Sequence, residues 1–123
     1  MDLQNKKILI VEDDEMNFIY LSQIFKIARI HTIRAKTGYE AIDILKHDSG
    51  IDLILMDIQL PDISGIEVTE KIRKFNGSVP VIAQTAAKNE HERDMILSSG
   101  FTDVLVKPFK MEILLAKIKE HIS

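Results

Sequence analysis

Four short apolar runs, separated by longer segments with helical spacing, most constrain the fold of this chain. The runs are continuous rather than alternating, as in the central strands of a parallel sheet that helices cover on both faces. Strands that alternate with helices indicate βαβ units and an α/β fold. Residues 30–35 alternate between apolar and polar and are predicted to form an edge strand. The continuous runs are Ile8-Leu9-Ile10-Val11, Leu53-Ile54-Leu55-Met56, Val81-Ile82-Ala83 and Val104-Leu105-Val106.

Five helices are predicted between and after these strands. The first and the last have apolar faces at helical spacing. The fourth, near Glu90–Ser98, has its apolar residues clustered at 95–97, so we expect it to be weakly anchored and mobile. Three helices open with a capping residue that is followed three positions later by Glu. These pairs are Thr37 with Glu40, Ser64 with Glu67, and Asn89 with Glu92.

The bulk properties exclude several classes of protein. A length of 123 residues fits a single domain over residues 1–123, and the net charge of −3 gives no electrostatic footprint for nucleic acid. Residues 1–7 lack the apolar region of a signal peptide, and no apolar run approaches the roughly 20 residues of a membrane helix. The absence of cysteine excludes disulfides and thiolate chemistry. We therefore expect a soluble cytoplasmic domain that binds no nucleic acid directly and does not insert into a membrane.

Residues suited to phosphate or metal chemistry end four of the predicted strands. In an open parallel sheet, ligand sites form in the crevice outside the carboxyl ends of the strands. These side chains are therefore predicted to face one pocket, which would suit a divalent cation, a reactive carboxylate and a phosphoryl group. The residues are Glu12-Asp13-Asp14, Asp57, Thr85 and Lys107.

The carboxylates have two interpretations each. Asp57 is either a nucleophile that forms an acyl phosphate or a strand-ending Asp that binds loop amides; the other strand ends favour the nucleophile. Glu12 and Asp13 would bind Mg²⁺, which prefers oxygen ligands in octahedral geometry. Alternatively, the acidic run complements the dipole of a helix N-terminus, an interpretation that we assign to Asp14 and Glu15.

The remaining strand ends suit a phosphoryl group. The Thr85 hydroxyl would donate to a phosphoryl oxygen, although a threonine here could also cap the loop. The Lys107 ammonium would neutralise phosphate charge, and its bond to Pro108 is a candidate cis peptide.

Other residues are given no chemical role at this point. The first helix carries more apolar residues than one packing face needs, so it is either a docking surface for a partner or a buried helix. Four scattered histidines are expected at the surface: His31, His47, His91 and His121. Four methionines are expected in the core: Met16, Met56, Met95 and Met111.

Taken together, four motifs resemble the receiver domain of two-component response regulators, in order and over essentially the whole chain. Shorter stretches at 14–17, 84–86 and 100–103 resemble receivers attached to hybrid histidine kinases. The four motifs are Ile8–Asp14, Leu53–Asp62 followed by Ser64-Gly65, Ala83–Ala86 and Val106–Phe109.

This resemblance implies a flavodoxin-like (βα)₅ fold, a doubly wound parallel five-stranded sheet with strand order 2-1-3-4-5. It implies a histidine kinase or a histidine phosphotransfer domain as phosphoryl donor, and an output domain or effector protein as the target of the signal. Asp57 would be the phosphoacceptor. Asp13 and Asp57 would hold Mg²⁺ (or Mn²⁺) with the backbone carbonyl of Gln59, and Glu12 would act through water.

The resemblance also assigns the phosphoryl contacts, to Thr85 and Lys107. Two features depart from the family pattern. Val104 stands where many receivers have an aromatic residue that swings inward, so an aromatic readout is not expected. Ala87 and Gln59 occupy positions that tune the access of hydrolytic water in this family, and they leave the lifetime of the phosphorylated form open.

Three other functions fit these residues less well. A phosphatase of the haloacid dehalogenase type would have a second Asp two residues after the nucleophile, where this chain has Gln59, which cannot shuttle a proton at neutral pH. An FMN carrier would cradle phosphate with Gly, Ser and Thr amides, whereas residues 12–15 are acidic. A pseudo-receiver used only for docking would not need the chemical residues present here. The expected function is therefore a phosphoacceptor signalling domain with slow self-dephosphorylation and no small-molecule turnover.

Overall fold

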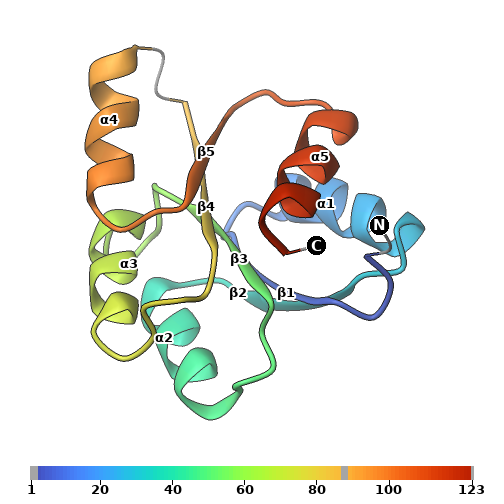
Figure 1. The fold of residues 1–123 in the computed structure, drawn as a ribbon, viewed down its shortest axis with the longest axis horizontal. Coiled ribbons are helices and arrows are strands. Elements are labelled where there is room, and N and C mark those ends of the chain that lie inside the picture. Colours follow the sequence, from blue (N-terminus) through green and yellow to red (C-terminus); the bar gives the residue numbers. More distant parts are fainter. Residues whose placement is uncertain (1–2, 87–88, 123) are drawn as a thin grey trace.

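The computed structural model describes residues 3–86 and 89–122. Within these residues, five parallel strands form one sheet in the order β2-β1-β3-β4-β5, and a helix follows each strand (Figure 1). The predicted flavodoxin-like (βα)₅ fold and its strand order are confirmed. In chain order, the elements are β1 (Lys7–Val11), α1 (Glu15–Ile27), β2 (His31–Ala35), α2 (Gly38–His47), β3 (Leu53–Asp57), α3 (Gly65–Arg73), β4 (Val81–Thr85), α4 (Glu90–Ser98), β5 (Asp103–Val106) and α5 (Met111–Ile122).

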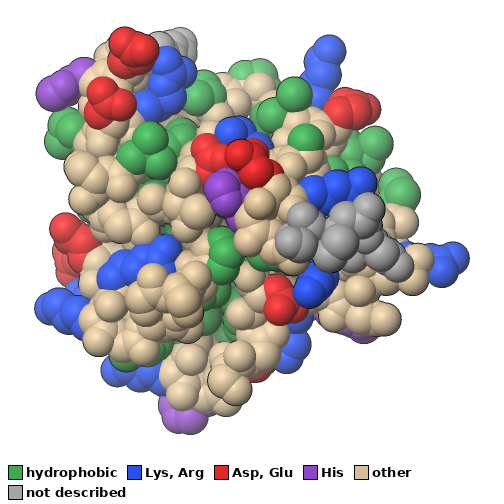
Figure 2. Space-filling model, in the orientation of Figure 1, with side chains coloured by type: hydrophobic (Ala, Val, Ile, Leu, Met, Phe, Trp, Pro, Cys, Tyr) green, Lys and Arg blue, Asp and Glu red, His purple; other side chains and the backbone are tan. Residues whose placement is uncertain are grey.

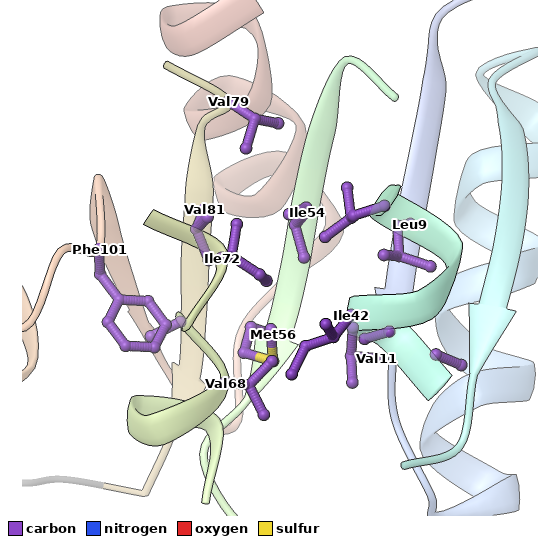
Figure 3. Packing of buried hydrophobic residues seen from close by; sticks show 14 of the residues in the cluster. Leu9, Val11, Ile42, Ile54, Met56, Val68, Ile72, Val79, Val81 and Phe101 are labelled. Atoms are coloured by element: carbon purple, nitrogen blue, oxygen red, sulfur yellow. The ribbon is translucent and has the colours of Figure 1, made fainter. Parts of the chain in front are cut away.

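The sheet separates two apolar layers. Helices α2, α3 and α4 lie over one face, and α1 and α5 lie over the other (Figure 1). In β1, Leu9 and Val11 belong to the cluster under α2–α4, whereas Ile8 and Ile10 belong to the cluster under α1 and α5. Figure 3 shows the first cluster, in which Val68 of α3 packs with residues of the sheet. The apolar runs are continuous because helices cover both faces.

The edge strand was predicted correctly. Among the strands of residues 3–86 and 89–122, β2 pairs with β1 alone, in register from Lys7 with His31 to Val11 with Ala35, and His31 is exposed. All five residues of β3 and of β4 are buried, as befits strands inside the sheet.

The helix starts agree with the three predicted caps, and Asp14 provides a fourth at the start of α1. In each case the side-chain oxygen of the capping residue accepts the backbone N–H three positions later, which satisfies one of the unpaired donors of the first turn. The pairs are Asp14 with Asn17 at 2.8 Å, Thr37 with Glu40 at 3.1 Å, Ser64 with Glu67 at 3.2 Å and Asn89 with Glu92 at 2.9 Å. Asp14 therefore belongs to the helix start, as expected.

Three expectations about single residues were wrong. Met16 and Met95 are 74% and 54% exposed, because they lie on the solvent sides of α1 and α4. His121 is half-buried: its Nε2 lies 2.9 Å from Asp103 Oδ2, and Lys117 contacts the same carboxylate at 3.0 Å. Figure 2 shows acidic, basic and histidine side chains together where α5 lies beside β5. Among the described residues, no helix is both long and apolar enough to cross a membrane.

Candidate functional site

The carboxyl ends of the central strands bring the predicted site residues together. Glu12 and Asp13 follow β1, Asp57 ends β3, and Lys107 follows β5. With Gln59 they line a cleft of about 410 Å³. The prediction that all four strand ends face one pocket therefore holds for the acidic residues and Lys107, but it is wrong for Thr85, which does not line this cleft.

Three carboxylates crowd one side of this cleft. Glu12, Asp13 and Asp57 each offer an oxygen, and these oxygens lie within 4.8 Å of one another. Glu12 is fully buried and Asp57 is 7% exposed. Burial, followed by the hydrogen bond with Asp57, raises the pKa of Glu12 to about 7, against the lowering contribution of Asn17. This oxygen-only set of crowded carboxylates fits Mg²⁺, whose charge would relieve the repulsion.

The Lys107 ammonium faces two of these carboxylates. Lys107 Nζ lies 3.2 Å from Asp57 Oδ2 and 4.0 Å from Glu12 Oε1. The Lys107–Pro108 peptide bond is cis, the isomer anticipated as an option. The backbone N–H of Gln59 donates to the other Asp57 oxygen, Oδ1, at 3.2 Å. Asp57 thus has one oxygen toward the ammonium and one toward the loop that follows β3.

Thr85 lies outside the acidic cleft. It is 8% exposed and lines a second hollow, of about 440 Å³, together with Asp57, Lys107 and Glu92. The backbone N–H of Lys107 donates to the Thr85 carbonyl at 2.8 Å, which ties the ends of β4 and β5 together. Asp57 and Lys107 are therefore shared by an acidic hollow and a threonine hollow.

The two departures from the family pattern have different outcomes. Val104 is 9% exposed and packs in the cluster that contains Ile96 of α4 and Phe101, so the position is apolar and filled. Ala87 lies outside the described residues.

A glycine holds α3 close to the end of β3. A Cβ on Gly65 would lie 2.2 Å from the Asp57 carbonyl oxygen, so a larger side chain would force the backbone to move. The Gly65 N–H donates to the Ile58 carbonyl at 2.8 Å. The Ser64-Gly65 pair therefore fixes both the start of α3 and the short loop that positions Asp57.

Sequence reasoning missed two amides behind the acidic hollow. Asn17 Nδ2 donates a hydrogen bond to Glu12 Oε1 and a second to Gln84 Oε1, the latter at 3.2 Å. Gln84 is fully buried, although its side chain is polar and it follows three apolar residues in β4. A glutamine directly after a continuous apolar run, one position before the strand-ending Thr85, is the signal that could have identified this pair.

The fold and these residue types define a flavodoxin-like α/β protein with an acidic, lysine-containing cleft at the carboxyl edge of its sheet. Comparison with known families assigns the class. The model of the response regulator receiver domain matches residues 8–119, and the chain belongs to this family. It is thus a receiver domain of the two-component phosphorelay systems, a class of signalling switches.

Similar proteins agree with this assignment. The chain is 35% identical over 120 residues to the polar-differentiation response regulator DivK of Brucella ovis, covering 96% of this chain and 97% of DivK. The receiver domain of Saccharomyces cerevisiae Ssk1, co-crystallised with the histidine phosphotransfer protein Ypd1, is 34% identical, with a TM-score of 0.91 and coverage of 99% and 92%.

A third relative is the receiver domain of a sensor histidine kinase from Pseudomonas aeruginosa, whose crystal structure has a magnesium ion coordinated in the active-site cleft. It is 32% identical, with a TM-score of 0.88 and coverage of 96% and 98%. Because the relatives include both a response regulator and a kinase-attached receiver, the hybrid-kinase subtype stays a prediction.

Proposed function

We propose that residues 1–123 form one receiver domain in which Asp57 takes a phosphoryl group from a phosphohistidine donor in a Mg²⁺-dependent reaction. One observation carries the proposal: the Asp57 carboxylate lies beside an ammonium and two further carboxylates, and it lines two hollows. A carboxylate held in this way is available as a nucleophile and is surrounded by groups that suit a cation and a phosphate.

The cation would be held by Asp13, Asp57 and the Gln59 carbonyl, with Glu12 acting through water. When bound, Mg²⁺ (or Mn²⁺) would offset the charge that develops on the phosphoryl oxygens. The crowding of Glu12 and Asp57, with the raised pKa of Glu12, supports a cation at this position.

In the transfer step, an Asp57 oxygen attacks the phosphorus while the bond between phosphorus and the donor imidazole nitrogen breaks. The Lys107 ammonium, which lies 3.2 Å from the Asp57 carboxylate, neutralises charge on the phosphoryl group. The Thr85 hydroxyl donates to a phosphoryl oxygen and reports its arrival. These contacts favour one of two pre-existing conformations, because the phosphoryl group binds that conformation better.

No small-molecule turnover is proposed. Gln59 stands where a haloacid dehalogenase phosphatase would have its general acid, and its amide cannot exchange a proton at neutral pH. The acyl phosphate is therefore expected to hydrolyse slowly, without a dedicated proton donor at residue 59.

The donor is proposed to dock beside the cleft, on the first turns of α1. Met16, Ile19 and Tyr20 are 74%, 46% and 43% exposed. Tyr20 also lines a hollow that reaches Lys107 and Phe109. An exposed apolar patch next to a reactive group suits a protein phosphodonor, and the Ssk1 receiver has such a partner in its co-crystal. The signal is proposed to leave through α4, β5 and α5, toward an output domain or effector protein.

The first experiment is intact mass spectrometry of the protein with Mg²⁺ and acetyl phosphate. We expect one phosphoryl adduct, which is absent from an Asp57→Asn variant and from a sample treated with EDTA. An adduct on the folded variant, or an adduct that survives EDTA, would contradict the assignment of Asp57 or of the cation.

A second experiment uses a histidine-phosphorylated phosphotransfer protein as donor. Met16→Ala should slow this transfer while it leaves loading by acetyl phosphate unchanged. Ile27→Ala is the matched control, because Ile27 is 76% exposed but lies at the far end of α1, about 16 Å along the helix. Equal slowing by both variants would contradict docking beside the cleft.

A further inference from the structure

The side-chain amide of Gln84 is buried, and among the described residues its NH₂ group lacks a hydrogen-bond partner. Gln84 pairs in register with Asp57, and its side chain is fully buried. Its Oε1 accepts from Asn17 Nδ2, but among the described residues its Nε2 has no hydrogen-bond acceptor. Buried polar groups are nearly always hydrogen-bonded, so an unpaired one requires an explanation.

Asn17 connects Gln84 to the acidic hollow. Its backbone N–H donates to Asp14 Oδ2 at 2.8 Å, which fixes the residue in the first turn of α1. The two hydrogens of its side-chain NH₂ go to Glu12 and to Gln84. The opposite orientation would put Asn17 Oδ1 against the Glu12 carboxylate and the Gln84 carbonyl oxygen. Together with the Glu12 carboxylate, Gln84 Oε1 thereby favours the orientation in which Asn17 presents donors to Glu12.

The orientation of Glu12 matters because Lys107 has two carboxylates near it. Lys107 Nζ is 3.2 Å from Asp57 and 4.0 Å from Glu12. Glu12 Oε2 also accepts the Asp14 N–H at 3.2 Å. The hydrogen bond from Asn17 holds Glu12 Oε1 at 4.0 Å from Lys107 Nζ, beyond hydrogen-bond distance. Without Asn17, the Glu12 carboxylate is free to turn toward the ammonium and away from the cation position.

We propose that Gln84, acting through Asn17, is a positioning residue that holds Glu12 for cation binding, at the expense of fold stability. This inference rests on the proposed function, since it assumes that Mg²⁺ binds beside Glu12. Gln84 shares its strand face with Ile82, which belongs to the apolar cluster under α1 and α5. An apolar side chain of similar length at position 84 would extend that cluster and remove the unpaired donor.

The test compares Gln84→Met with the wild type by two readouts. Thermal unfolding without divalent cations should show a melting temperature that is unchanged or higher by about a few degrees. Titration calorimetry should show Mg²⁺ affinity reduced about tenfold, as is typical for groups that orient a metal ligand. A purely structural role would lower stability, or would leave affinity unaltered. Gln23→Met, on the exposed part of α1, is the control and should change neither value.

A double-mutant cycle tests whether Gln84 acts through Asn17. In an Asn17→Ala background, Gln84→Met should cause no further loss of Mg²⁺ affinity. Additive losses, an unaltered affinity, or a fall in melting temperature together with affinity would each overturn the inference. If the wild-type protein binds no Mg²⁺, the proposed function fails, and this inference fails with it. If the wild-type protein binds Mg²⁺ but Gln84→Met does not weaken the binding, only the role of Gln84 is wrong.

Discussion

The two hollows that share Asp57 border two different helices, α1 and α4, and these helices are anchored to the core to different extents. α1, with thirteen residues, buries Leu21, Ile24 and Phe25. α4, all nine of whose residues are described, buries Ile96 alone. Both helices begin with a side-chain cap, and the two capping hydrogen bonds are of similar length. Capping therefore decides where each helix starts, whereas buried apolar area decides how firmly it is attached.

This difference coincides with a difference in chemistry. On the α1 side, the hydrogen bonds from Asn17 fix Glu12 and lead to the buried Gln84. On the α4 side, Thr85 ends its strand a few residues before α4 begins. We infer that the α1 side holds the cation in a fixed geometry and that the α4 side moves when the phosphoryl group arrives. Segments with few buried contacts open at the least cost in free energy.

The largest expected effect is on stability, and a matched pair of isoleucines measures it. Ile24 and Ile96 are 5% and 4% exposed, so their burial is nearly equal. Ile24→Ala should lower the free energy of unfolding by about 3 kcal/mol. Ile96→Ala should cost only about 1 kcal/mol, because α4 can detach locally instead of keeping a cavity. Urea unfolding measures both values, and equal costs would remove the distinction between the two helices.

The second expected effect is on cation binding, whose pH dependence should report the titration of Glu12 in the hollow beside α1. The pKa of Glu12 is raised to about 7 by burial and by Asp57, so below that pH a proton must leave before Mg²⁺ binds. Affinity should therefore be roughly tenfold tighter at about pH 8 than at about pH 6. Calorimetry in buffers of different ionisation enthalpy should detect proton release, and Glu12→Gln should abolish it. A pH-independent affinity would show that Glu12 is not the titrating group.

The smallest expected effect concerns the ion pairs that join β5 to α5. Because Asp103 of β5 binds Lys117 and His121 of α5, we expect the weakly anchored region to be α4 alone. Burial alone would raise the pKa of Asp103, but hydrogen bonds from His121, the Val104 N–H and Lys117 outweigh it and keep the pKa below its ordinary value. A carboxylate with a depressed pKa contributes stability above its ordinary pKa and loses it as the pH falls through the lowered value.

Asp103→Asn should therefore destabilise the protein by about 1 kcal/mol near pH 7. The difference from the wild type should shrink once the pH falls below the ordinary pKa of aspartate, 3.8. Thermal unfolding over a pH series measures this. A cost that is the same at acid and neutral pH would indicate a packing effect rather than an electrostatic one.

Local patterns predicted the elements well. The apolar runs and the pairs Ser64/Glu67 and Asn89/Glu92 gave strands and helix starts because those signals depend on neighbours in the chain. The strand order came from the family resemblance, not from the periodicity. The site residues converge for a topological reason, since the carboxyl ends of parallel strands share one edge.

The failures involve the orientation of helix faces and contacts between distant segments. Met16 and Met95 were placed in the core by residue type, but the helix face decides burial. The bond between Asn17 and Gln84 spans 67 residues, and that between Asp103 and His121 spans 18. Sequence spacing does not predict contacts between residues so far apart in the chain. The buried amide and the half-buried histidine therefore required the folded structure.

The most direct test of the account is hydrogen exchange of α1 and α4 during phosphorylation. Protein held in excess acetyl phosphate and Mg²⁺ would be compared with unphosphorylated protein and with Asp57→Asn under the same conditions. The account predicts altered exchange in α4, residues 90–98, with little change in α1, residues 15–27, and neither change in the variant. An equal change in both helices, or a change confined to α1, would contradict the assignment of the movable side to α4.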